Sequence, residues 1–157
     1  MVFQLFQELS YLGYVGLFLI SLFGSATIIF PLPAAGFIFA AAAPLNPFIL
    51  AAVTGIGAAV GEVVGYVLGW GGRKIGEKKL KKDLERAEKM FDRYGGFITL
   101  VIFAATPLPD DVVGIISGIL NYDIKKFFVA VSIGKTIFHL VVALAGHYGI
   151  TAILNYI

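Results

Sequence analysis

The chain has 157 residues, of which 59% are hydrophobic and only 14% are charged, and its mean hydropathy is +0.90. A soluble domain has about a quarter charged residues, whereas roughly 20 apolar residues are enough to cross a bilayer. No Asp, Glu, Lys or Arg lies between Glu8 and Glu62. The composition excludes a soluble globular protein and predicts an integral membrane protein. The absence of cysteine excludes disulfides and thiolate chemistry.

Charge is concentrated in residues 73–93, which hold nine of the twelve Lys and Arg residues together with five acids. A basic segment can indicate nucleic-acid binding, but here acids are interleaved and apolar segments lie on both sides. Positively charged loops of membrane proteins stay in the cytoplasm. We therefore expect residues 73–93 to face the cytoplasm of a multi-pass protein in the plasma membrane, with no nucleic-acid partner.

The first predicted element is a membrane helix over residues 1–23. No basic residue precedes its apolar stretch, so we do not expect a cleaved signal peptide. Gly13 and Gly16 mark a point at which this helix could be broken.

Residues 24–72 form the first half of an internal repeat. Pro31 and Pro33 lie in the middle of an apolar segment, and a long helix is predicted to follow over residues 46–72. Asn46 is a favourable N-cap for this helix, and the proline after it suits the first helical position.

Residues 73–94 predict an amphipathic helix. Its apolar residues recur on one face at helical spacing: Leu80, Leu84, Ala87, Phe91 and Tyr94. Such a helix is typical of segments that lie on a membrane surface, and we expect it on the inner leaflet. A plain helical connector and a dimer contact are the alternatives.

Residues 95–146 repeat the first half, with Pro107 and Pro109 again in the middle of an apolar segment. Asp123 is predicted to cap the last long helix. We expect this helix to end or bend before a short tail over residues 147–157, because glycines flank that point.

Two prolines one residue apart break a helix, because proline lacks a backbone donor and disfavours helix in the residue before it. About a dozen apolar residues remain on either side of each break, too few to span a bilayer. We therefore predict two re-entrant helical hairpins, inverted relative to one another as in many secondary transporters. The predicted fold class is an all-α polytopic membrane protein with a single transmembrane domain over residues 1–157. Five simple spans with kinks are the alternative.

Five ionisable residues in the apolar segments are candidates for a transport or proton site: Glu62, Asp110, Asp111, Lys135 and His139. Glu62 and Lys135 occupy corresponding places in the two halves, so they could form an ion pair, with either a pathway role or a static one. One aspartate could cap the helix after the proline break. Two adjacent carboxylates in an apolar pocket cannot both ionise cheaply, which favours proton carriage by the other. His139, one turn after Lys135, could relay a proton or be a packed hydrogen-bonding group.

A stripe of small residues recurs every four positions: Gly57, Gly61, Gly65 and Gly69. It permits close helix packing and would press Glu62 and Tyr66 against a partner element. The two histidines lie too far apart, and lack acids at ligand spacing, for a metal site. No nucleotide-binding or hydrolase motif occurs, so we expect neither a cofactor nor an enzyme.

Three segments carry a family resemblance: PLPAAGFIFAAA (31–42), GEVVGYVLGWGGRKIG (61–76) and RYGGFITLVIFAATPLPDDVVGIISGIL (93–120). They are similar to the DedA family, also called the VTT-domain or SNARE-associated Golgi protein family, and the resemblance covers about residues 24–146. It implies two facing, inverted re-entrant loops. It also implies lipid translocation: undecaprenyl-phosphate recycling in bacterial members and phospholipid scrambling in eukaryotic ones.

The chain departs from the family pattern in both loops. Ala34 and Ala35 stand where the first loop usually carries a glutamate. Asp110 stands where the second loop usually carries an arginine. Recognition of a phosphate by that arginine therefore does not transfer to this chain.

An acid at Asp111, with Gly134 and Lys135 downstream, is closer to the YqaA-like branch of the family. Positive charge for a phosphate would then come from Lys135, Arg73 and the N-termini of the half-helices. We expect a transporter that moves a lipid or lipid-linked phosphate between leaflets, coupled to protons, with membrane lipids as partners and a homodimer as its assembly. A proton- or cation-coupled exporter of small solutes and a non-transporting membrane scaffold are the alternatives.

Overall fold

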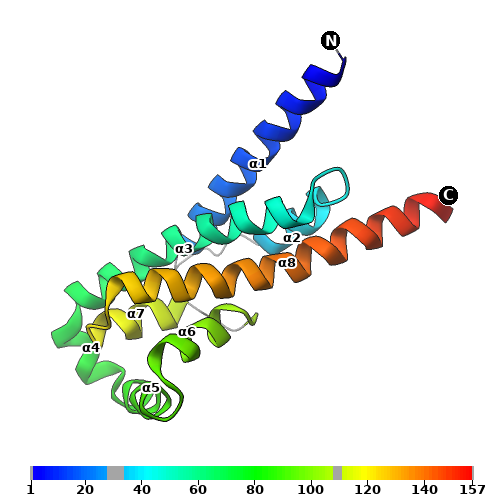
Figure 1. Ribbon diagram of the computed structural model, residues 1–157. Coiled ribbons are helices and arrows are strands. Elements are labelled where there is room, and N and C mark those ends of the chain that lie inside the picture. The colour runs from blue at the N-terminus through cyan, green and yellow to red at the C-terminus, as the bar shows by residue number, and fades with distance from the viewer. Residues whose placement is uncertain (1, 28–33, 108–110, 157) are drawn as a thin grey trace.

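The computed structural model describes residues 2–27, 34–107 and 111–156, and for residues 2–10, 111 and 154–156 only the backbone path is described. Eight helices form within these ranges: α1 (Val2–Ala26), α2 (Ala34–Ala41), α3 (Pro47–Gly71), α4 (Arg73–Lys79), α5 (Lys81–Tyr94), α6 (Gly96–Ala104), α7 (Asp111–Ile119) and α8 (Ile124–Tyr156). The predicted all-α fold class is confirmed for the described residues (Figure 1).

Helices α3 and α8 lie side by side at the centre of the molecule and run in opposite directions (Figure 1). Both are long and apolar enough to cross a membrane, with a mean hydropathy of 1.9 over Pro47–Gly71 and 2.0 over Ile124–Ile153. Their outer faces expose large apolar side chains such as Val64 and Ile137. Extended apolar surfaces of this kind are typical of contact with lipid.

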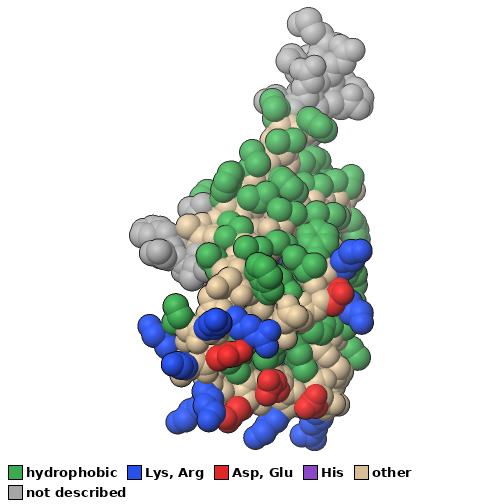
Figure 2. Space-filling view, turned by 90° about the vertical axis from the view of Figure 1, so that its left-hand side faces the viewer, with side chains coloured by type: hydrophobic (Ala, Val, Ile, Leu, Met, Phe, Trp, Pro, Cys, Tyr) green, Lys and Arg blue, Asp and Glu red, His purple; other side chains and the backbone are tan. Residues whose placement is uncertain are grey.

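Charged side chains gather at one end of the molecule, while apolar side chains cover much of its body (Figure 2). We call this the charged end; it is formed by α4 and α5, which carry most of the Lys and Arg residues. The beginning of α8 and the connection from α7 lie near it (Figure 1).

Two predicted caps fix the beginnings of the long helices. The Asn46 side-chain oxygen accepts hydrogen bonds from the amides of Phe48 (3.0 Å) and Ile49 (3.2 Å), and proline occupies the first position of α3. The Asp123 carboxylate accepts a hydrogen bond of 2.8 Å from the amide of Lys126 at the start of α8. Both caps satisfy amides that the helix itself leaves without partners.

Replacing Asp123 with alanine should lower the free energy of unfolding by about 0.5–2 kcal/mol, because the first turn of α8 loses its side-chain acceptor. The thermal unfolding midpoint in detergent measures the effect. Asp92→Ala is the matched control, since Asp92 is an exposed aspartate near the end of α5. Equal effects of the two substitutions would show that the cap contributes nothing specific.

Two predicted helix interruptions are wrong. Helix α1 is continuous through Gly13 and Gly16. Helix α8 continues through Gly146 to Tyr156, beyond the point where we expected it to end or bend. A Cβ at Gly146 would collide with the carbonyl oxygen of Phe39, so this glycine lets α2 pack closely on α8. An isolated glycine costs a helix only about 1 kcal/mol, and packing of this kind offsets it.

The predicted amphipathic segment is divided at Leu80 into α4 and α5. Its apolar face packs within the protein: Leu84 is buried against Ile116 and Ile119 of α7. Phe91 meets the ring of Tyr122 edge-on at 5.4 Å. Much of the face that we expected to lie on the inner leaflet packs on α6 and α7, because those short helices offer it an apolar surface. The position of this segment relative to the membrane stays a prediction.

Helices α1, α2, α6 and α7 pack on α3 and α8 in an exchanged pattern. Helix α1 lies on α3 while α2 lies on α8; helix α6 lies on α8 while α7 lies on α3 (Figure 1). Helices α2, α6 and α7 have eight, nine and nine residues. At 1.5 Å per residue they are roughly 12–14 Å long, less than half of a bilayer core.

Candidate functional site

An ion pair is buried where α3 and α8 cross. Nζ of Lys135 lies 3.2 Å from Oε1 of Glu62, and the two residues are only 7% and 2% exposed. Charges removed from water are stable only when paired and hydrogen-bonded. The pairing expected from their corresponding places in the repeat is therefore present, at the centre of the fold.

A glycine precedes each member of the ion pair and lets a neighbouring helix pack closely beside it. A Cβ at Gly61 would collide with the carbonyl oxygen of Leu22 in α1. A Cβ at Gly134 would lie 2.5 Å from the carbonyl oxygen of Val101 in α6. Because neither glycine has a side chain, α1 and α6 approach the long helices backbone to backbone, on either side of the ion pair.

The glycine stripe of α3 is buried along its whole length. A Cβ at Gly57 would lie 2.7 Å from the carbonyl oxygen of Phe18 in α1. A Cβ at Gly69 would collide with the carbonyl of Ile115 in α7. The stripe therefore receives α1 at one end and α7 at the other, and Gly65 is buried between them.

The first turn of α7 lies beside the Glu62 carboxylate. A Cβ at Gly114 would lie 3.3 Å from Oε2 of Glu62 and 3.2 Å from its backbone oxygen. Helix N-termini carry amides without intrahelical partners and the positive end of the helix dipole. The N-terminus of α7 therefore favours the charged form of the Glu62 carboxylate, as Lys135 also does.

His139, one turn after Lys135, bonds to the opposite long helix. Its Nδ1 lies 3.0 Å from Oγ1 of Thr54, and that hydroxyl donates to the carbonyl of Leu50 at 2.7 Å. Because the hydroxyl has one proton and Leu50 takes it, the histidine must donate from Nδ1. The contact therefore requires a proton on Nδ1 of His139, and both side chains are buried.

Replacing Thr54 with valine should destabilise the protein by about 1–3 kcal/mol, because the Nδ1–H of His139 loses its acceptor in a buried position. Thr54→Ser keeps the hydroxyl and should cost much less. Unfolding of both variants in detergent provides the comparison. If valine is tolerated as well as serine, the hydrogen bond is not what holds His139.

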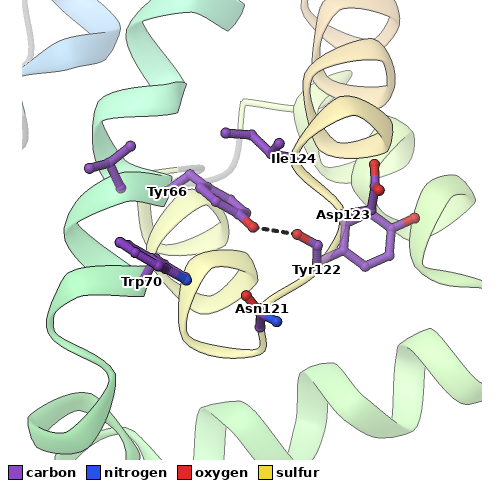
Figure 3. Close-up of a pocket in the computed structure, with 7 residues that line it drawn as sticks. Tyr66, Trp70, Asn121, Tyr122, Asp123 and Ile124 are labelled. Carbon is purple, nitrogen blue, oxygen red and sulfur yellow. Dashed lines mark hydrogen bonds between the residues drawn. The ribbon is translucent and has the colours of Figure 1, made fainter.

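Tyr66 mirrors His139 on the other side of the ion pair. It lies one turn after Glu62, its ring packs on Phe127 with centroids 5.1 Å apart, and its hydroxyl donates to the carbonyl of Tyr122. It also lines an open pocket of about 610 Å³ beside the α7–α8 connection. Figure 3 shows the Tyr66 ring pointing from α3 to this connection, with Trp70 and Asn121 below it.

Other predicted site residues are not brought to the ion pair or are not described. Arg73 begins α4, is half exposed, and bonds to Glu77 at 2.9 Å. It lies eleven residues after Glu62, roughly 16 Å along the helix direction. Pro107 follows α6 and is exposed, and Asp111 begins α7 without a described side chain. Four predicted residues lie outside the described ranges: Pro31, Pro33, Pro109 and Asp110.

Sequence reasoning missed Thr54 and Gly114. Gly114 and Gly118 repeat the four-residue spacing of the α3 stripe, and both lie against α3, at Glu62 and Tyr66. That spacing could have been found. Thr54 had no comparable signal, because only the crossing of α3 and α8 brings it to His139. Among the described residues, no three His, Asp or Glu side chains come together to hold a metal ion.

Two long apolar helices, short helices packed on them, and a buried ion pair at their crossing define a helical membrane protein. The family model of the VTT domain matches residues 27–148, and the chain belongs to this family, the DedA or SNARE-associated family of membrane proteins. No curated protein and no solved structure matches the chain.

Proposed function

We propose that this protein moves an anionic lipid or lipid-linked phosphate between the leaflets of the plasma membrane, by transport rather than catalysis. The observation that carries the proposal is the Glu62–Lys135 pair, buried at the crossing of α3 and α8. Ionisable residues at this depth are costly and usually mark a pathway. The pair also lies at the junction of the short helices, through Gly61, Gly134 and Gly114.

In this proposal the short helices form two inverted re-entrant hairpins, the end of α1 with α2 and α6 with α7. Their exchanged packing on α3 and α8 supports an inverted repeat, and their length supports entry without crossing. The charged end then lies in the cytoplasm by the positive-inside rule. Both hairpins would meet beside the ion pair. At that point the least hydrocarbon would separate the pair from the water on either side of the membrane.

The ion pair supplies a mechanism. Lys135 offsets Glu62 at rest, and an arriving phosphate would take Lys135 as its counter-ion. A carboxylate left alone in apolar surroundings binds a proton rather than staying charged. Movement of the phosphate is thereby coupled to uptake of a proton by Glu62, with Asp110, Asp111 and His139 as the relay. An acidic second loop of this kind favours the YqaA-like branch of the family.

Lipid flux in proteoliposomes tests the proposal, with fluorescent phospholipid and polyprenyl-phosphate reporters at two values of pH. Wild type is compared with Asp110→Asn/Asp111→Asn. Flux that depends on pH in wild type, and is lost in the folded double variant, supports proton coupling through the second loop. If neither reporter moves in wild type, lipid transport is wrong.

An exporter of small cationic solutes is the second candidate, favoured by the acidic residues of the second loop. A scaffold in which the ion pair is only structural is the third. Cation flux without lipid flux would select the exporter. Substitutions that lower stability, in a protein that transports neither class, would select the scaffold.

A further inference from the structure

A second cavity lies at the charged end, between α5 and the two short helices α6 and α7. Its volume is about 350 Å³. It exists because α6 packs on α8 whereas α7 packs on α3. These two short helices therefore diverge, and α5 crosses below both of them (Figure 1). Its inner wall is apolar, with Phe91, Phe103, Val113 and Ile116. Cavities of this size and lining are typical of sites for small amphiphilic molecules.

One hydroxyl in the cavity wall has no hydrogen-bond partner among the residues that the structure describes. Ser117 is fully buried, and its Oγ makes no hydrogen bond among the described residues. An unpaired hydroxyl in apolar surroundings is unfavourable, and each such case calls for an explanation. Thr99 is a further hydroxyl residue of the lining, and its Oγ1 lies 3.4 Å from the carbonyl oxygen of Met90. A ligand with a hydrogen-bond acceptor next to an apolar chain would accept a hydrogen bond from the Ser117 hydroxyl and pack against the apolar walls.

The mouth of the cavity offers an anion an exposed guanidinium group. Arg86 and Asp83 of α5 both line the cavity, 3.8 Å apart, and the Arg86 side chain is 79% exposed. Lys82 precedes Arg86, and Lys89 and Arg93 follow it, along one exposed stripe of α5 at helical spacing. A guanidinium group binds a phosphate through paired N–H donors, and neighbouring charges strengthen the attraction.

We propose that this cavity holds an acyl chain of an anionic glycerophospholipid, with the ester carbonyl on the Ser117 hydroxyl and the phosphate at Arg86. A polyprenyl phosphate fits the walls but has no acceptor along its chain for Ser117. The site is separate from the Glu62–Lys135 pair. Lipid binding at this site requires only that the protein lies in a membrane, so it can be tested independently of transport.

Photolabelling tests the place of binding. Phosphatidylglycerol with a diazirine on one acyl chain is activated with the purified protein, and labelled residues are mapped by mass spectrometry. We expect labels on cavity residues of α5, α6 and α7. Ala87→Trp should fill the cavity and reduce them at least fivefold, whereas Asp92→Trp, at an exposed position of α5 that does not line the cavity, should not. Labels confined to the outer faces of α3 and α8 would overturn the proposal.

The chemistry of the occupant is tested without filling the cavity. Wild type should prefer an ester-linked probe to its ether-linked analogue by about two- to tenfold, the effect of one hydrogen bond, and Ser117→Ala should remove this preference. Arg86→Gln should weaken binding of both probes, while Lys74→Gln, at an exposed position of α4 that does not line the cavity, should not. Equal binding of ester and ether by wild type, or stronger labelling by a diazirine polyprenyl phosphate, would contradict the assignment.

Discussion

Lys135→Met should destabilise the protein by about 3–5 kcal/mol, because it leaves the buried Glu62 carboxylate without its cation. Glu62 is 2% exposed, so water cannot replace the lysine. Denaturant titration in mixed micelles measures the loss of stability. The same variant should have no lipid flux, since a transported phosphate would have no counter-ion at the crossing of α3 and α8.

The double variant Glu62→Gln/Lys135→Met separates the two effects. Removing both charges together avoids an unpaired one, so most of the lost stability should return. If the single and double variants are equally unstable, the 3.2 Å contact is not an interacting ion pair. The double variant is therefore the folded, uncharged form in which transport can be examined.

Alanine at Gly61 or Gly134 should destabilise the protein by about 1–3 kcal/mol, because overpacking forces neighbouring backbone to move. At Gly134 the new Cβ would lie 2.5 Å from the Val101 oxygen and 2.6 Å from the Ala104 Cβ. Neither neighbour is the end of a flexible side chain. The substitution should also reduce flux, because α1 or α6 would be displaced from the ion pair. Thermal unfolding and flux are measured on the same preparation.

Gly16→Ala is the matched control for this prediction. A Cβ at Gly16 would meet nothing within 4 Å, so alanine there should stabilise α1 by about 0.5–1 kcal/mol through its better helix propensity. If alanine at Gly61 or Gly134 is as harmless as at Gly16, the short helices do not depend on backbone contact with α3 and α8.

The sequence was sufficient for features that depend on local or repeated patterns. Asn46 and Asp123 were predictable as caps because an N-cap acts within three residues. The pairing of Glu62 with Lys135 was predictable because each follows a glycine at the same place in an internal repeat. Hydropathy identified α3 and α8 as long apolar helices.

Features set by tertiary packing were not predictable from one sequence. The glycines near residue 147 indicated an end of α8, but Gly146 receives the backbone of α2 and the helix continues. The apolar stripe of α5 indicated a membrane surface, but α7 covers Leu84. Amphipathic patterns tell which face is buried and not what covers it. Thr54 became a partner of His139 only through the angle at which two helices cross.

Lipid flux by the folded Glu62→Gln/Lys135→Met variant, measured beside wild type, tests whether the ion pair is part of a transport path. The liposomes contain both phospholipid and polyprenyl-phosphate reporters. We expect flux of at least one reporter by wild type, and none above protein-free liposomes by a variant that unfolds at nearly the wild-type midpoint. Equal flux by the two proteins would contradict it, because the buried pair would then only hold α3 and α8 together.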